Sequence, residues 1–288
     1  MLRIARPFTA TLFLVMLLAA DSWAQESSTL PTGLDAGVLA QALSHVGGAS
    51  DALLPPLSSR STIIARGNFG KAIYSDSSAS YTRLEDGLYD VRDSSRMAAN
   101  MNIGEGAGST SSTLSLCGLV ALFSAGNSRS VNKIATAAGN WILETTSSVD
   151  FGNHYKATLL ESSTPSLCNP IPGSDFTMRV DSVKTTRIEG PYVRDKTVDH
   201  NFSFIQTCKV AAMPEPASRI AAALAGEYLD VTCEFSDEKN RPVTTRYAFL
   251  THYRYYLTVQ TVAKNQRSET AYSSAHRTEP EGSPGTAR

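Results

Sequence analysis

The sequence predicts an α+β fold that is rich in β-structure, with antiparallel sheet in a sandwich or barrel-like arrangement and a few short helices. Apolar and polar residues alternate from Leu229 to Phe235, which is a strand pattern. Apolar residues also favour odd positions from Val243 to Val262, but one strand of that length would span about 60 Å at about 3.3 Å per residue. This length predicts a bend or hairpin near Thr251 to Arg254. Four cysteines behind an export signal predict two disulfide bonds.

The composition is that of an ordinary globular protein and narrows the choice of partner. The 288 residues are 42% hydrophobic and 18% charged, with 26 Lys+Arg against 27 Asp+Glu. Binding to nucleic acid or to an anionic membrane surface depends on an excess of basic residues, which this chain lacks. We therefore expect no nucleic-acid partner, and the charge balance gives no support for a polybasic membrane-binding surface.

The first 24 residues have the pattern of a signal peptide. Arg3 and Arg6 precede an apolar run at 8–20, and Ser22 and Ala24 are the small residues of a cleavage site. An uncleaved anchor is the alternative, but 13 helical residues cover about 20 Å of a hydrocarbon core about 30 Å thick. We expect cleavage near Ala24, no membrane span in the mature chain, and a periplasmic or secreted location.

The cysteines allow three disulfide connectivities. We prefer Cys117–Cys168 with Cys208–Cys233, because the second pair brackets a compact strand, helix and strand pattern. Free buried thiols are the alternative. The spacing contains no C-x-x-C, so neither a thiol redox motif nor a zinc ribbon is indicated.

The chain divides into five regions by composition. After the signal peptide come a flexible lead, an N-terminal helix with an irregular or β region, a β-rich core that holds the cysteines, and a disordered polar tail; these are residues 25–33, 34–113, 114–263 and 264–288. Whether the folded part is one domain or two stays open.

Within these regions, periodicity predicts several elements. Apolar spacing predicts a helix in 34–54, short strands in 61–93 and a loop over 94–113. A second helix is predicted at 131–142, with Trp141 packed in the core; a ligand-stacking role for Trp141 is the alternative. Strands should follow at 155–160, 175–188 and 202–210, with a short helix at 217–225.

No catalytic or nucleotide-binding motif is present. The five histidines are scattered, so no metal site and no cofactor are expected. The weak catalytic candidates are Asp195, Asp199 and His200, two carboxylates and an imidazole within six residues that could orient a general base. The alternative is a polar loop between two strands.

An aromatic and basic ribbon supplies weak binding candidates. If Tyr253 and Tyr255 face the core, strand alternation leaves Arg246, His252, Arg254 and Tyr256 outside; Tyr and Arg are enriched where proteins bind partners.

A β scaffold without catalytic spacing favours a non-enzymatic envelope binding or accessory role, with an unknown protein or glycan partner. The alternatives are a secreted hydrolase whose site is assembled from distant segments, or an inhibitor or immunity-type protein.

Overall fold

A computed structural model describes residues 31, 33–47, 57–64, 75–85, 87–97, 107–138, 141–191, 193–236, 241–264 and 266–274. The predicted signal peptide, its cleavage site and residues 275–288 of the predicted tail lie outside the described residues. The side chain of Trp141 is also outside them, although its backbone belongs to a strand.

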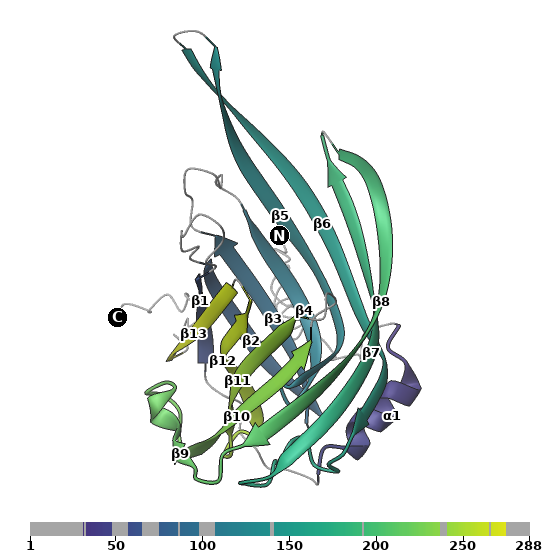
Figure 1. Ribbon diagram of the computed structural model, residues 1–288, viewed down its shortest axis with the longest axis vertical. Helices are drawn as coiled ribbons and strands as arrows, with labels where there is room; N and C mark the ends of the chain where they lie inside the picture. Colours follow the sequence, from purple (N-terminus) through teal and green to yellow (C-terminus); the bar gives the residue numbers. More distant parts are fainter. Residues whose placement is uncertain are drawn as a thin grey trace, which may run out of the picture. The chain divides into compact units, whose positions relative to one another are not determined.

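The described residues form one curled antiparallel sheet with one α-helix and one 3₁₀-helix (Figure 1). This confirms the predicted β-rich, antiparallel class, realised as a single curled sheet. The strands are β1 (Leu57–Ile64), β2 (Ser75–Glu85), β3 (Leu88–Met97), β4 (Gly108–Leu116), β5 (Val120–Ala138), β6 (Trp141–Ser162), β7 (Asp175–Gly190), β8 (Val193–Val210), β9 (Glu215–Pro216), β10 (Glu227–Ser236), β11 (Pro242–Leu250), β12 (Tyr255–Ala263) and β13 (Gln266–Ser274).

The sheet is mostly a meander, in which each strand pairs with the next. Strands β2 to β8 are neighbours in sequence order, β8 then pairs with β10, and β10 to β13 continue the series. Strand β1 crosses to the far end and pairs with β13. Strands from residues 34–113 and from residues 114–263 therefore belong to one sheet. The turn at residues 251–254 joins β11 to β12 where the sequence predicts a hairpin.

The predicted N-terminal helix is present as α1 (Ala36–Ser44). The side chain of Asp35 caps it, because its Oδ1 accepts hydrogen bonds from the backbone N–H groups of Gly37 and Val38 at 2.8 and 3.3 Å. Val38 and Ala42 are buried, and Oε1 of Gln41 accepts a hydrogen bond from the backbone of Leu160 in β6 at 3.0 Å. The helix thus covers part of β6.

The helix predicted at 131–142 is wrong, because these residues are the arms of the β5–β6 hairpin. Ala138 pairs with Trp141, and the register continues to Val131 opposite Ser148. Gly139 and Asn140, between the arms, are residue types that favour a two-residue hairpin connection. That local signal predicts the strands better than the spacing of apolar residues does.

Three further predictions need correction. The loop predicted at 94–113 contains the end of β3 and all but the last three residues of β4, and the predicted tail contains β13. Hydroxyl groups pair across the strands, with Ser95 and Ser109 2.7 Å apart and Thr113 donating to Ser124 at 3.0 Å. Such pairs stabilise a sheet without apolar alternation. Of the helix predicted at 217–225, only the 3₁₀-helix η1 (Ala217–Arg219) is formed.

The structure contains the two disulfides that the spacing favours. Cys208 and Cys233 lie directly opposite each other in β8 and β10, and Cys117–Cys168 links the β4–β5 turn to the segment after β6. All four cysteines are buried in one apolar cluster, which also includes residues of α1.

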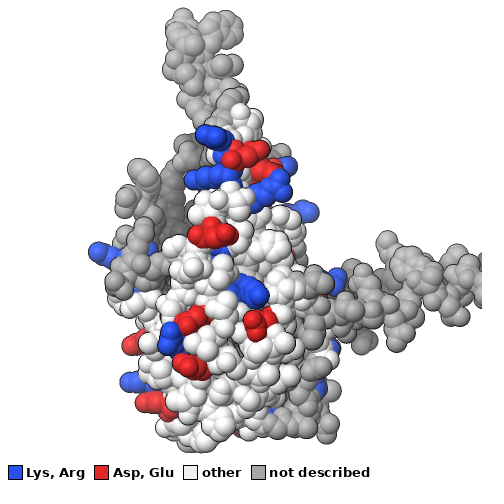
Figure 2. Space-filling view, turned by 90° about the vertical axis from the view of Figure 1, so that its right-hand side faces the viewer, with Lys and Arg blue, Asp and Glu red and all other residues white. Residues whose placement is uncertain are grey.

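Charged side chains of both signs are interspersed on the face shown in Figure 2. The ion pairs among the described residues are exposed or partly exposed, as in Arg187–Glu189 and Arg219–Glu215. Exposed pairs of this kind contribute about 0 to 1 kcal/mol each. No helix in the described part of the chain is long and apolar enough to cross a membrane.

Candidate ligand-binding groove

The structure separates the three residues considered for catalysis. Asp195, Asp199 and His200 are exposed residues of β8, not of a loop. Successive strand residues point to opposite faces, so His200 faces away from both carboxylates. Asp199 accepts a hydrogen bond from Thr185 at 2.7 Å, and the ring of His200 stacks on Phe202. The three side chains therefore do not converge on one site.

Two of the residues considered for binding have structural roles. Tyr256 does not face outward: it is 1% exposed, and its hydroxyl donates to the carbonyl oxygen of Leu167 at 2.8 Å. Burial raises the pKa of this hydroxyl, which keeps it protonated as a donor. Strand alternation fails here because both faces of β12 are covered at this end, so Tyr255 and Tyr256 are both buried.

Arg254 is an anchor for neighbouring segments. It lies in the β11–β12 turn with φ of 48°, and its guanidinium donates to the carbonyl oxygens of Cys168, Val46 and Gly47 at 3.2 to 3.4 Å. This joins the turn to the end of α1 and to the segment that holds Cys168.

The other two residues considered for binding are exposed. His252 lies in the same turn as Arg254. Arg246 bonds Asp230 across the strands at 2.7 to 2.9 Å, and this hydrogen bonding raises its pKa. Arg246 also lines a hollow of about 600 Å³ with residues of β12 and β13.

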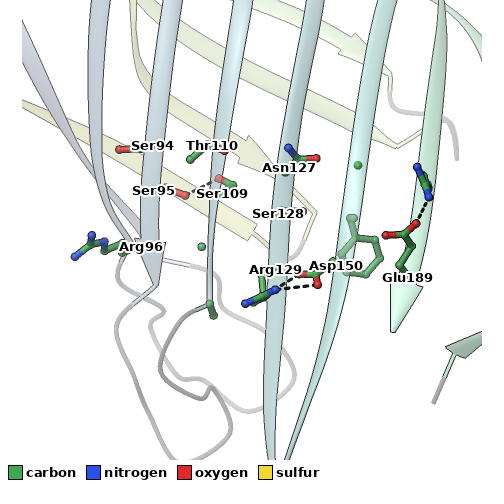
Figure 3. A pocket seen from close by; sticks show the side chains of 15 residues that line it. Ser94, Ser95, Arg96, Ser109, Thr110, Asn127, Ser128, Arg129, Asp150 and Glu189 are labelled. Atoms are coloured by element: carbon green, nitrogen blue, oxygen red, sulfur yellow. Dashed lines mark hydrogen bonds and ion pairs between the residues drawn. The ribbon is translucent and has the colours of Figure 1, made fainter. Parts of the chain in front are cut away.

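A larger groove, of about 940 Å³, crosses five neighbouring strands from β3 to β7. Strand register explains its lining, which falls into three transverse rows of directly opposed residues (Figure 3). The first row is charged: Arg96, Gly108, Arg129, Asp150 and Glu189. The second is polar: Ser94, Thr110, Asn127, Gly152 and Arg187. The row between them is Ser95, Ser109, Ser128 and Phe151, and strand alternation turns its side chains to the opposite face of the sheet from those of the other two rows.

Most charges of the groove are paired with one another. Nε and Nη2 of Arg129 donate to the two carboxylate oxygens of Asp150 at 2.6 and 3.0 Å, which is a two-pronged contact (Figure 3). Arg187 pairs with Glu189. Arg96 makes no ion pair with any described residue. Among the described residues, the guanidinium of Arg96 therefore has no carboxylate partner at the β3 end of the groove.

Ionisation states follow from these contacts. The hydrogen bonds from Arg129 lower the pKa of Asp150 below the ordinary aspartate range, and Asp150 in turn raises the pKa of Arg129. Both side chains stay about half exposed, at 57% for Arg129 and 46% for Asp150. The groove therefore presents fixed, accessible charges at neutral pH.

Two glycines leave the groove floor open. A Cβ atom at Gly108 would lie 2.4 Å from the carbonyl oxygen of Ser95, so this position excludes other residues. At Gly152 a Cβ atom would meet only Asn127 and Arg187, at the ordinary distances of 3.6 and 3.7 Å. The space beside Gly152 is therefore open, and the backbone at this position could carry a side chain.

The described residues of the lining include no His or Cys. A glycosidase pair requires one carboxyl that stays protonated, whereas the pKa of Asp150 moves the other way. In the part of the chain that is described, no three His, Cys, Asp or Glu side chains cluster as metal ligands.

Sequence reasoning missed this groove because its residues lie far apart along the chain. Gly108 belongs to a G-x-G-x-G run, but that run predicts only a flexible loop. Only the strand register brings Arg96 into line with Glu189. No family model, curated protein or solved structure matches the chain. The function is therefore inferred from the chemistry of the groove residues.

Proposed function

We propose that this protein is an exported, non-enzymatic binding or accessory protein of the cell envelope, periplasmic or secreted, and that the β3–β7 groove holds its ligand. The observation that carries the proposal is the register of the groove, which aligns a charged and a polar row across five strands. A wide groove rich in accessible hydrogen-bonding groups is typical of a recognition surface.

The contacts of the described groove residues favour binding without turnover. A hydrolase needs an activated nucleophile or a carboxyl held in its acid form. Asp150 is held ionised by Arg129, and Ser95 and Ser109 bond to each other on the opposite face of the sheet. Two disulfides fit an oxidising compartment outside the cytoplasm, in agreement with the signal-like N-terminus.

The test uses the mature chain, residues 25–288, in two assays. In the first, a panel of ester, peptide and glycan substrates should show no hydrolysis, and turnover of any of them would overturn the non-enzymatic reading. In the second, the protein should sediment with the envelope fraction of the source cells. A Gly152→Phe variant, which fills the groove, should sediment less, whereas Thr158→Phe, an exposed position on the same strand outside the groove, should behave as the parent. Equal sedimentation of both variants would remove the groove from the proposal.

A further inference from the structure

We propose that the groove binds a linear acidic oligosaccharide, with one ligand carboxylate paired to Arg96. This inference rests on the proposed function and names the ligand class of the same groove.

The length of the groove favours a chain-like ligand. Its rows cross five strands that are about 4.8 Å apart, so the groove is about 19 Å long, at right angles to the strands. Its volume of about 940 Å³ is at the upper end for small-molecule sites. A single sugar or metabolite would fill only part of it.

The lining offers what a sugar chain requires. Hydroxyl groups of a sugar both donate and accept hydrogen bonds, and the groove supplies hydroxyl, amide, guanidinium and carboxylate groups along its length. The Arg129–Asp150 pair presents planar donors and acceptors that are fixed by their mutual contact.

Other polymer classes fit less well. An extended peptide usually binds by adding a strand to a sheet edge, but β3 to β7 are all interior strands whose backbone groups are already paired. An acyl chain needs an apolar lining, whereas the charged and polar rows carry no apolar side chain. Nucleic acid needs many unpaired cations, whereas two of the three arginines are paired.

The positive charge of Arg96 favours an acidic glycan over a neutral one. It is exposed at the β3 end of the charged row, and Arg129 and Arg187 already have carboxylate partners. A ligand carboxylate at Arg96 would complete the row with a third arginine–carboxylate pair.

The experiment is isothermal titration of the mature chain with three probes. Two are linear acidic glycans from different sources: an alginate hexamer, and glycan strands freed of peptide from peptidoglycan. The third is cellohexaose, a neutral linear glycan. We expect a dissociation constant below about 1 mM for at least one acidic probe and binding at least tenfold weaker for cellohexaose. Binding of one acidic probe alone identifies the source.

Matched variants assign the binding to the groove. Gly152→Phe should weaken binding at least tenfold, because it adds a ring at a lining position where a Cβ atom makes only ordinary contacts, 3.6 Å from Asn127 and 3.7 Å from Arg187. Arg96→Gln should weaken binding about tenfold, which corresponds to 1.4 kcal/mol. Thr158→Phe and Arg179→Gln, exposed substitutions outside the groove, should leave it unchanged.

The glycan inference is overturned if neither acidic probe binds at about 1 mM, if cellohexaose binds as tightly, or if Gly152→Phe or Arg96→Gln binds like the parent. Groove-dependent sedimentation with the envelope, in the absence of acidic glycan binding, would refute the glycan alone and leave the proposed function intact. Turnover of a substrate would refute the proposed function instead.

Discussion

Removal of the Cys117–Cys168 disulfide should destabilise the protein more than removal of Cys208–Cys233. The first bridge spans a sequence separation of 51 residues and the second 25. In the chain-entropy model, closure of these loops contributes about 4.1 and about 3.5 kcal/mol to stability at 25 °C. Loop length alone therefore predicts a difference of about 0.6 kcal/mol.

The surroundings of the two bridges should widen this difference. Cys208 and Cys233 face each other inside a paired ladder, where Val210 opposite Val231 continues the register without the bridge. Cys168 lies in a segment outside the sheet, held by Leu167 donating to the carbonyl of His45 and by the contacts of Arg254 and Tyr256. Loss of its bridge should loosen these contacts as well.

The measurement is urea denaturation of the double-alanine variants Cys117→Ala/Cys168→Ala and Cys208→Ala/Cys233→Ala, followed by far-ultraviolet circular dichroism. With a slope of about 3 kcal/mol per molar urea for a chain of this size, a loss of about 4 kcal/mol lowers the midpoint by about 1.3 M. A loss below about 2 kcal/mol for the first variant, or a greater loss for the second, would refute the reasoning.

Three other substitutions test local features of the fold. Tyr256→Phe leaves the buried carbonyl of Leu167 without its donor and should cost about 1 to 2 kcal/mol in urea denaturation; an unchanged midpoint would contradict that contact. Gly118→Ala should lower the melting temperature by more than about 3 °C, because φ is +77° and the new Cβ atom would lie 2.4 Å from a backbone oxygen; Gly152→Ala is the control that should stay unchanged. Asp93→Asn should raise the melting temperature by about 1 to 2 °C at pH 7, since burial raises the pKa of Asp93. Because the pKa of Asp93 is higher in the folded state, the stability of the parent protein falls as pH rises above the pKa that Asp has in the unfolded chain. The gain in melting temperature from Asp93→Asn should therefore vanish below about pH 3.9, where the carboxyl group is protonated in both states. A gain that persists below that pH would refute burial of the carboxylate as its cause.

Local sequence patterns were sufficient where one short segment determines its own structure. Alternation from Leu229 to Phe235 predicts β10, and the length of the following apolar stretch predicts the turn that the structure has at residues 251–254. The even number of cysteines and their spacing favour the two bridges that the structure contains. These signals lie within neighbouring residues, so they can be read from the chain alone.

Local patterns failed where long-range pairing decides. The stretch 94–113 lacks apolar alternation and resembles a loop, yet its hydroxyl groups pair across β3 and β4 once neighbouring strands complete the ladder. Tyr256 has the position of an outward residue in its strand, but the segment that holds Leu167 and Cys168 covers its side chain.

The groove itself was decided by the tertiary structure alone. The sequence determines that the chain is rich in strands, balanced in charge and supplied with serine, threonine and glycine. It does not specify that Arg96 and Glu189 share a row, because that alignment depends on four successive strand registers. A shift of one residue in any of them would turn part of the row to the other face of the sheet.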